Sequence, residues 1–492
     1  MDAAGGGPGR VRADRSVISP ALYECLDAGD SALRVIFDLN PDYPRGLTGA
    51  ASEVGVLLGQ AAIEFGRVDP EEQTRTPHDL GGPYVAALLS PQALLWIVRR
   101  DLEQAERDDW SLRAIRRVWP DFEVHPLLDR SLATIKADAA RAAFAAAGAG
   151  ITWAVVDSGI DQRHPHFRTW RNLDLPTHVE HIDFTGERSP LTDEVGVGHG
   201  TAVAGIVGGE ARGGEDGPLR IRRTLLDGDR GIDAKAETLE HISGVAPQCK
   251  LVSYKVFSPR RPSSVSTVLA ALAHIQRVND HGRNLRIHGV NLSLGYPIDP
   301  DWFVGSYSPL CTEVDRLTRS GVVVVAAAGN TGLVRLNSVG GGVAGAQGAF
   351  GAQLTITDPG NARYALTVGS THREAPHTYG VSCFSAKGPT GDGRLKPDLV
   401  APGERVLSAA SLRPQPDEEE WDNPAYTEFS GTSFAAPHVS GAIAAFLSVR
   451  REFIGQVDRV REIFTDSAVD LGRLPEFQGR GLVDLMRALQ SV

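Results

Sequence analysis

The sequence predicts an α/β protein with a doubly wound, mostly parallel sheet and helices on both faces. Three observations support this prediction. From about residue 151 onward, short β-rich runs alternate with longer helical ones. The β-rich runs are nearly continuous in apolar residues, as strands are when both faces are buried. The helical stretches lie between consecutive runs, as expected when each strand returns to the same sheet through a helix.

Five strands carry this pattern. They are ITWAVVD (151–157), LVSYKVF (251–257), GVNLSLG (289–295), GVVVVAAAGN (321–330) and ALTVGS (365–370). Helices are expected at 266–280 and 311–320. Two stretches rich in glycine, 208–231 and 340–351, are expected to be surface loops. The acidic run PDEEEWD (416–422) is expected to be a solvated loop or a recognition site for a basic substrate.

The region before residue 130 has a different order of expected strands and helices, which predicts a small α+β domain. Strands are expected at 33–40, 84–90 and 115–125, with a helix at 51–66. A second helix would begin after Ser90 as its N-cap, with Pro91 in its first turn. About 15 residues at the start are expected to be disordered. We therefore predict two domains, 1–130 and 131–492.

Composition excludes several classes of partner. The chain has 492 residues, 42% of them hydrophobic, and a formal net charge of -11. An acidic surface repels phosphates, so no nucleic-acid partner is expected. The first twenty residues contain no apolar core of a secretory signal, and no run approaches the roughly 18 apolar residues of a membrane span. We expect a cytoplasmic protein without a membrane partner.

The cysteines and a histidine pair give no sign of a metal centre. Four cysteines lie far apart without metal-type spacing and are expected to be buried thiols: Cys25, Cys249, Cys311 and Cys383. His178 and His181 form an H-x-x-H pair that lacks the glutamate of a zinc protease motif. No residue is assigned as a metal ligand.

Polar side chains occur where three predicted strands end. Asp157 ends the first strand, Ser293 lies near the end of the third, and Asn330 closes the fourth. Ligands of open parallel sheets bind beyond the carboxyl ends of the strands. The three side chains should therefore reach one rim of the sheet.

Two further residues lie at predicted helix starts. His199 stands between two glycines in GVGHGTAVAGIVGG (196–209), and Ser433 lies in FSGTSFAAPHVSG (429–441). From Phe434 the sequence is apolar almost all round, which is typical of a buried central helix. Pro437 is tolerable only in the first turn of that helix, which places the helix start at or just before Ser433. The free amides there favour negative charge.

These residues together are able to carry out nucleophilic catalysis. A serine hydroxyl is a weak nucleophile and needs a base in contact, and the base needs an orienting acceptor. His199 and Asp157 supply these two groups for Ser433. Asn330 can donate to an oxyanion together with the backbone amide of Ser433. Each residue alone has an ordinary structural explanation as a turn or cap residue, but their combination on one rim predicts a catalytic site.

The chain resembles the subtilisin-like serine proteases. The resemblance covers about 150–490 and rests on motifs in the family's order: VVDSGID (155–161) with His164 and Pro165, GHGTAVAGIVGG (198–209), GVAP (244–247), NLSLG (291–295), AAAGN (326–330), SCFSAKGPTGDGRLKPDLVAPG (382–403), SGTSFAAPHVSG (430–441) and GRGLVDLMRAL (479–489). It implies a serine endopeptidase that hydrolyses peptide bonds of proteins or peptides through an acyl-enzyme intermediate.

The resemblance also implies a role for each site residue. Ser433 would be the nucleophile, His199 the general base and then acid, Asp157 the group that orients the imidazole, and Asn330 the oxyanion donor. The substrate would bind along two segments: Ser293, Leu294 and Gly295 on one side, and Ala327, Ala328 and Gly329 on the other. Small residues on the second wall suggest a pocket open to sizeable apolar side chains.

The N-terminal domain resembles the ferredoxin-like propeptide of the same family, which assists folding and inhibits the enzyme. Its last strand would lead EVHPLLDRS (123–131) into the cleft. Cleavage between about Trp119 and Ala137 would release the mature enzyme, so the chain is expected to be an autoprocessed or self-inhibited zymogen. The alternative is a permanently attached interaction domain.

The chemistry requires no cofactor, but the resemblance is compatible with a structural calcium ion. The family's calcium loop precedes GVAP, and the segment 208–243 replaces it here. Oxygen ligands are available, although their spacing does not identify a site. The acids in this segment are Glu210, Glu215, Asp216, Asp227, Asp229 and Asp233.

Two alternative functions predict different sequence features. An esterase of the α/β-hydrolase type needs G-x-S-x-G and the order Ser, Asp, His. Here the serine lies in GTSFA, and His438 is the one histidine that follows it. A binding protein that keeps the fold without activity is the other alternative. Nothing in the sequence favours it, because all four catalytic positions are intact.

Overall fold

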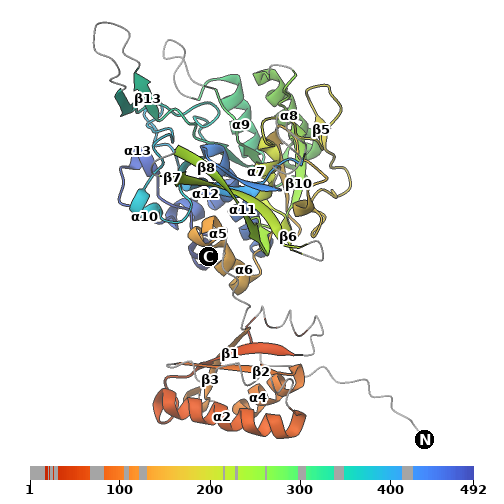
Figure 1. Cartoon of the computed structure of the whole chain (residues 1–492), viewed down its shortest axis with the longest axis vertical. Helices are drawn as coiled ribbons and strands as arrows, with labels where there is room; N and C mark the ends of the chain where they lie inside the picture. Colours follow the sequence, from red (N-terminus) through yellow and green to blue (C-terminus); the bar gives the residue numbers. More distant parts are fainter. Residues whose placement is uncertain are drawn as a thin grey trace, which may run out of the picture. The chain divides into compact units, whose positions relative to one another are not determined.

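The computed structural model describes residues 17–19, 22, 26, 32–66, 83–104, 110–120, 130–213, 217–227, 231–260, 263–296, 306–336, 348–412 and 425–492. The chain divides into two compact units (Figure 1). One comprises 1–126 with 142–145, and the other comprises 127–141 with 146–492. The sequence had placed the boundary at residue 130.

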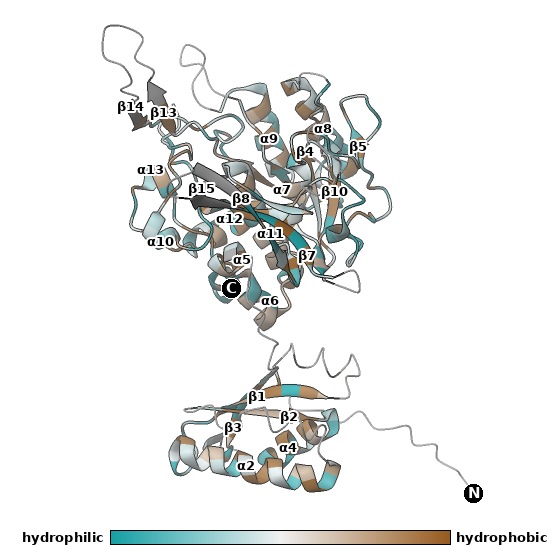
Figure 2. Ribbon diagram, viewed as in Figure 1, coloured by the Kyte–Doolittle hydropathy of each residue, from teal (hydrophilic) through white to brown (hydrophobic). Residues whose placement is uncertain are grey.

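The N-terminal unit is a three-stranded antiparallel sheet with two helices. Its strands are β1 (Leu33–Leu39), β2 (Tyr84–Leu89) and β3 (Ile115–Pro120), in the order β2-β1-β3, and its helices are α2 (Gly46–Phe65) and α4 (Pro91–Gln104). β1 alternates between buried and more exposed residues, and α2 carries apolar and polar patches (Figure 2). Ser90 Oγ accepts a hydrogen bond from the Ala93 amide at 3.2 Å, so the predicted helix cap is confirmed.

The larger unit is built on a seven-stranded sheet in the order β16-β15-β12-β11-β4-β10-β5. Every neighbouring pair is parallel, which confirms the predicted α/β class. The strands are β4 (Thr152–Asp157), β5 (Ile182–Asp183), β10 (Lys250–Lys255), β11 (Gly289–Leu292), β12 (Val323–Ala327), β15 (Leu366–His372) and β16 (Leu399–Glu404).

Helices cover both faces of this sheet (Figure 1). Apolar residues of α8 (Val265–Val278) and α9 (Pro309–Arg319) share one core cluster with strand residues. On the other face, α7 (His199–Val207) and α11 (Thr432–Val449) pack against each other and the strands. The other α-helices described after β3 are α5 (Arg130–Thr134), α6 (Ala137–Phe144), α10 (Pro376–Tyr379), α12 (Val457–Asp466), α13 (Pro475–Gln478) and α14 (Leu485–Gln490).

The segment 208–231 is not a surface loop, and that prediction was wrong. It forms most of a β-hairpin of β7 (Leu219–Asp227) and β8 (Gly231–Leu239), within a second sheet of order β17-β18-β7-β8. Ile221 and Leu239 are buried against Tyr426 in this sheet. The arginine content of β7 hides its alternation of apolar and polar residues. The other two strands of this sheet are β17 (Val406–Ala409) and β18 (Tyr426–Phe429), and β6 (Glu210–Arg212) pairs with β9 (His241–Ser243) in a separate two-stranded sheet.

Other loop and cysteine predictions had mixed outcomes. In 340–351, β14 (Gly348–Gly351) pairs with β13 (Leu333–Leu336), whereas the rest lies outside the described residues, as do 416–422 and the first 16 residues. Cys249 and Cys311 are buried as predicted, but Cys383 is exposed in a turn, so its predicted burial was wrong. Cys25 lies outside the described residues.

The helix α11 is the one described helix with the length and apolar composition of a membrane span. Inside the fold 83% of its apolar window is buried. Its apolar character is therefore explained by its place in the core, as the sequence predicted for a central helix.

Three imidazoles are buried in the larger unit and bonded to backbone carbonyls. His164 Nε2 lies 2.7 Å from the Ala425 carbonyl, His166 Nε2 lies 3.0 Å from the Gly205 carbonyl, and His438 Nδ1 lies 2.8 Å from the Phe434 carbonyl. Burial lowers the pKa of His164 and His438 to about 4 and that of His166 to about 3. All three are neutral at physiological pH.

We expect the free energy of unfolding to fall as the pH drops below the ordinary histidine value. In the unfolded chain these imidazoles bind protons near pH 6.5, whereas in the fold they resist protonation until about pH 3 to 4. The stabilisation is therefore full above pH 6.5 and is lost on acidification, by roughly 2 kcal/mol per imidazole at pH 5. Denaturant unfolding between pH 8 and pH 5 measures this slope.

The matched variants are His166→Gln at the buried position and His377→Gln at an exposed one. The first should reduce the pH dependence by about one third, because His164 and His438 remain, and the second should leave it unchanged. An equal slope in both variants would show that other groups cause the acid sensitivity.

Candidate active site

A cleft of about 620 Å³ lies at the carboxyl ends of the central strands. His199, Ser433 and Asn330 all line it, although they come from segments far apart in the sequence. The remaining lining residues are Val195, Gly196, Val197, Phe257, Ser293, Leu294, Gly295, Ala327, Gly329, Thr331, Thr357, Phe429 and Thr432. Of the three side chains expected at one rim, Ser293 and Asn330 line the cleft, and Asp157 reaches it through its contact with His199.

Asp157 and His199 form the central contact of the site. Asp157 is the last residue of β4 and is 1% exposed, and His199 is the first residue of α7. The two side chains meet at 2.7 Å between Asp157 Oδ1 and His199 Nδ1. Gly200 permits this approach, because a Cβ there would lie 2.3 Å from the Gly159 carbonyl oxygen. The glycine after the histidine is thus a packing requirement.

A second buried carboxylate, Asp193, holds the start of α7. Its Oδ2 accepts hydrogen bonds from the Thr201 amide and the Thr201 hydroxyl, each at 2.8 Å. Asp193 therefore caps the helix that presents His199. Sequence reasoning missed this residue, because five residues separate it from the helix start and the usual cap spacing is absent.

The electrostatics of His199 suit a general base. Burial lowers its pKa, but the Asp157 charge, the hydrogen bond to Asp157 and the more distant Asp193 charge raise it, and the pKa lies above its ordinary value. The side chain is 30% exposed, so Nε2 can face the cleft. Because Asp157 accepts at Nδ1, that nitrogen carries the proton and Nε2 is the basic atom.

Ser433 is the second residue of α11, so its amide is one of the free donors at the helix start. Its hydroxyl donates to the Ser293 carbonyl at 3.3 Å. No hydrogen bond joins Ser433 to His199 in the part of the chain that the structure describes. Both side chains line one cleft, so a rotation of the serine side chain is required before it contacts the imidazole.

Asn330 is oriented by Thr432, which the sequence analysis did not single out. The Thr432 amide donates to Asn330 Oδ1 at 2.9 Å, and the Thr432 hydroxyl donates to it at 3.0 Å. A backbone amide can only donate, so the atom it contacts must be the side-chain oxygen. The side-chain NH₂ of Asn330 is therefore left for another acceptor, as an oxyanion donor requires.

Pro437 does not lie in the first turn of α11, and the predicted reason for its tolerance was wrong. It is the sixth residue of the helix, so the Ser433 carbonyl loses its usual intrahelical donor. The Ser293 hydroxyl donates to that carbonyl instead, at 2.6 Å. A residue of the expected substrate-binding segment thus satisfies the backbone of the serine.

The larger unit matches a known protein family. A model of the subtilase family matches residues 148–481. The chain belongs to the subtilase family. Subtilisin DY of Bacillus licheniformis is 28% identical over 343 residues, covering 70% of this chain and 92% of that protein. Serine protease AprX of Bacillus subtilis (strain 168) is 26% identical over 386 residues, covering 75% and 73% of the two chains.

Other similar proteins differ more in length. Membrane-bound transcription factor site-1 protease of Homo sapiens is 27% identical over 352 residues, which cover 70% of this chain but 25% of that protein. A solved structure of MycP1 with its N-terminal propeptide removed covers 73% of this chain and 96% of its own, at 22% identity and a TM-score of 0.48. Membership in the subtilase family excludes the α/β-hydrolase alternative.

The walls of the subtilase cleft match the predicted segments with one exception. Ser293, Leu294 and Gly295 line one side, and Ala327 and Gly329 line the other. Ala328 does not line the cleft; it is buried against Ile356 and Ala386. Side chains alternate along an extended segment, so the residue between two lining positions points away.

Thr357 is a cleft residue that the sequence did not reveal. It lies between the two walls, since a Cβ at Gly295 would be 2.6 Å from Thr357 Oγ1 and one at Gly329 would be 2.7 Å from Thr357 Cγ2. The side chain therefore occupies space between the small residues of both walls. The pocket is less open than those residues suggested.

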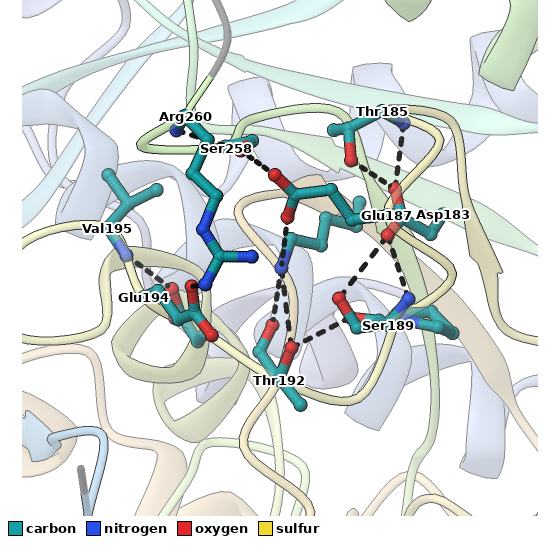
Figure 3. Close-up of polar contacts among 12 residues, drawn as sticks. Asp183, Thr185, Glu187, Ser189, Thr192, Glu194, Val195, Ser258 and Arg260 are labelled. Carbon is teal, nitrogen blue, oxygen red and sulfur yellow. Dashed lines mark hydrogen bonds and ion pairs between the residues drawn. The ribbon is translucent and has the colours of Figure 1, made fainter.

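A polar network fixes the loop that leads to His199 (Figure 3). Lys255 is fully buried at the end of β10 and donates to the Thr192 carbonyl at 3.1 Å. Asp183, at the end of β5, accepts from the Ser189 amide of this loop at 2.9 Å, and Glu187 in the loop accepts from the Ser258 hydroxyl. The network holds the loop whose following residues, Val195 and Val197, form an apolar wall of the cleft.

The acids named as candidate calcium ligands do not form a cluster among the described residues. No group of three or more His, Cys, Asp or Glu side chains that could hold a metal ion occurs among them. Glu210 is the one acid of this set whose side chain is described, and it contacts Trp170 Nε1 at 2.7 Å and His241 Nε2 at 2.9 Å. Glu215, Asp216 and Asp229 lie outside the described residues, and so do the side chains of Asp227 and Asp233.

We expect Thr357→Gly to widen the cleft between its two walls. Removing the side chain should raise kcat/KM for a substrate with a large aromatic side chain, relative to a small aliphatic one, by about tenfold. Paired peptide substrates that differ at the residue before the cleaved bond measure this ratio. Thr331→Ala, a change at the exposed rim, is the control; an equal shift in both variants would contradict the assignment.

Proposed function

We propose that this subtilase is a serine endopeptidase in which Ser433, His199, Asp157 and Asn330 carry the reaction. The observation that carries the proposal is the contact between His199 and the buried Asp157 in a cleft shared with Ser433 and Asn330. An inactive binding protein would have no need of a buried carboxylate that holds a half-buried imidazole.

The geometry supports the following course of reaction. The Ser433 hydroxyl turns from the Ser293 carbonyl to His199 Nε2, which takes its proton as the oxygen attacks the peptide carbonyl. Asp157 holds Nδ1–H and stabilises the imidazolium. The Asn330 side-chain NH₂ and the Ser433 amide donate hydrogen bonds that stabilise the oxyanion. His199 then protonates the leaving amine, and water hydrolyses the acyl-enzyme by the same steps in reverse.

The N-terminal unit is proposed to be a propeptide that inhibits the enzyme until it is cleaved. Support for a cleavage point comes from the packing of α5 within the larger unit. Ser131 Oγ lies 2.9 Å from the buried His438 Nε2, and the Ile135 carbonyl accepts from the Leu485 amide at 3.1 Å. Cleavage between Ser131 and Ile135 would remove Ser131 from its contact with His438, and cleavage after Ile135 would remove both contacts, so we place it upstream of Arg130. The segment 121–129 lies outside the described residues.

Intact mass and N-terminal sequencing of the full chain test the proposal directly. The wild type should lose a fragment that ends between Trp119 and Arg130, because its own serine cleaves there. Ser433→Ala should remain full length, and its kcat should fall by about 10⁶-fold, a value established on a subtilisin.

A fluorophosphonate that labels activated serines separates the remaining outcomes. Labelling of a full-length wild type would support the activity with a permanently attached N-terminal unit. Equal processing of wild type and Ser433→Ala would refute self-cleavage. An unlabelled, unprocessed wild type would favour the inactive binding protein.

The pH dependence of kcat/KM should report the raised pKa of His199. The base must be neutral, so activity should rise with pH through a midpoint above the ordinary value of about 6.5. Asp157→Asn removes the negative charge that raises the pKa, so its residual activity should show a midpoint at lower pH. Unchanged midpoints in the two proteins would contradict the assigned pair.

A further inference from the structure

A line of buried hydrogen bonds runs from the middle of α11 back to the backbone of Ser433. The Ser440 hydroxyl donates to Asn291 Oδ1 at 2.9 Å, and Asn291 Nδ2 donates to Ser293 Oγ at 2.8 Å. The Ser293 hydroxyl then donates to the Ser433 carbonyl at 2.6 Å. Ser440 and Asn291 are fully buried, and Ser293 is 3% exposed.

The direction of each hydrogen bond is fixed by the last acceptor. A carbonyl oxygen can only accept, so the Ser293 hydroxyl must donate its one proton to the Ser433 carbonyl. Its lone pair is then left to accept from the Asn291 NH₂ group. This orients the Asn291 amide so that its oxygen faces Ser440, whose hydroxyl is the donor that completes the line. Reversal at any one link would leave the Ser433 carbonyl without a donor.

The acceptor at the end of this line exists because of Pro437. The proline has no N–H, so the Ser433 carbonyl is without the donor that would normally lie four residues further along α11. A buried carbonyl without a partner is costly. Asn291 lies in β11, which is buried on both faces. Burying its side-chain amide is also unfavourable unless both the oxygen and the NH₂ group form hydrogen bonds.

We propose that Asn291 and Ser440 are positioning residues for the nucleophile, acting through Ser293. They keep the Ser293 hydroxyl on the Ser433 carbonyl and so fix the backbone on which the Ser433 side chain turns. The same hydroxyl ties this backbone to the segment 293–295, which lines the cleft. Substrate wall and nucleophile are thereby held as one unit. This inference rests on the proposed role of Ser433.

The test uses Ser440→Ala, Asn291→Leu and the double variant. Without the Ser440 hydroxyl, the Asn291 amide is free to turn its oxygen to Ser293 and draw that proton away from Ser433. Each single variant should lower kcat and the rate of Ser433 labelling by a fluorophosphonate by about tenfold, the rate equivalent of one lost hydrogen bond. KM should stay within about twofold, because no group that touches substrate is removed.

The double variant distinguishes positioning from general loss of stability. Ser440 acts through Asn291, so Ser440→Ala should have no further effect in the Asn291→Leu background. Thr318→Val is the matched control, since it removes a buried hydroxyl that donates to the Val314 carbonyl in α9. It should lower the melting temperature comparably and leave both rates unchanged.

Two results would contradict the positioning role. A wild-type kcat and a wild-type labelling rate in Ser440→Ala would overturn the proposal. The proposal would also fail if the loss of rate in the double variant were the product of the losses in the two single variants. If Asn291→Leu does not fold, Ser440→Ala compared with Thr318→Val still decides it by the labelling rate. A wild type that is not labelled at Ser433 would instead refute the proposed catalytic role of that serine, which is a separate failure.

Discussion

The hydrogen bond between the Asp157 carboxylate and His199 Nδ1 is the contact on which the site depends. It requires the end of β4 and the start of α7 to meet at 2.7 Å between side-chain atoms. Two features of the chain serve that requirement. Gly200 removes the side chain that would block the approach, and Asp193 caps the helix from a separate loop. The imidazole is therefore placed by backbone packing as well as by its partner.

The backbone of Ser433 is positioned by a hydrogen bond from outside its helix. A proline within α11 removes a donor, and the Ser293 hydroxyl replaces it. This local departure from helix geometry connects the nucleophile to the wall of the cleft. The oxyanion side is fixed in the same neighbourhood, since Thr432 orients Asn330 from the residue that precedes the serine. The positions of the nucleophile, the oxyanion donor and the link to the cleft wall thus all depend on the start of α11.

Much of the larger unit could be predicted because its signals are local. Continuous apolar runs identified the parallel strands, and polar residues at their ends identified the rim. The hairpin of β7 and β8 could not be predicted in this way, because its charged face dominates the sequence and its apolar face is defined by β17 and β18, which lie far away in the chain. Asp193 and Thr357 act across loops, so no sequence spacing marks them. Ala328 was assigned to the wrong face because a run of small residues does not show its alternation.

The most direct test of the account is a crystal structure of the protein inhibited by a fluorophosphonate. We expect phosphorus bonded to Ser433 Oγ, with one phosphonyl oxygen hydrogen-bonded to both the Asn330 side-chain NH₂ and the Ser433 amide, and with His199 still joined to Asp157. A covalent bond at another residue, or an oxygen that points away from Asn330, would contradict the convergence of these segments into one catalytic site.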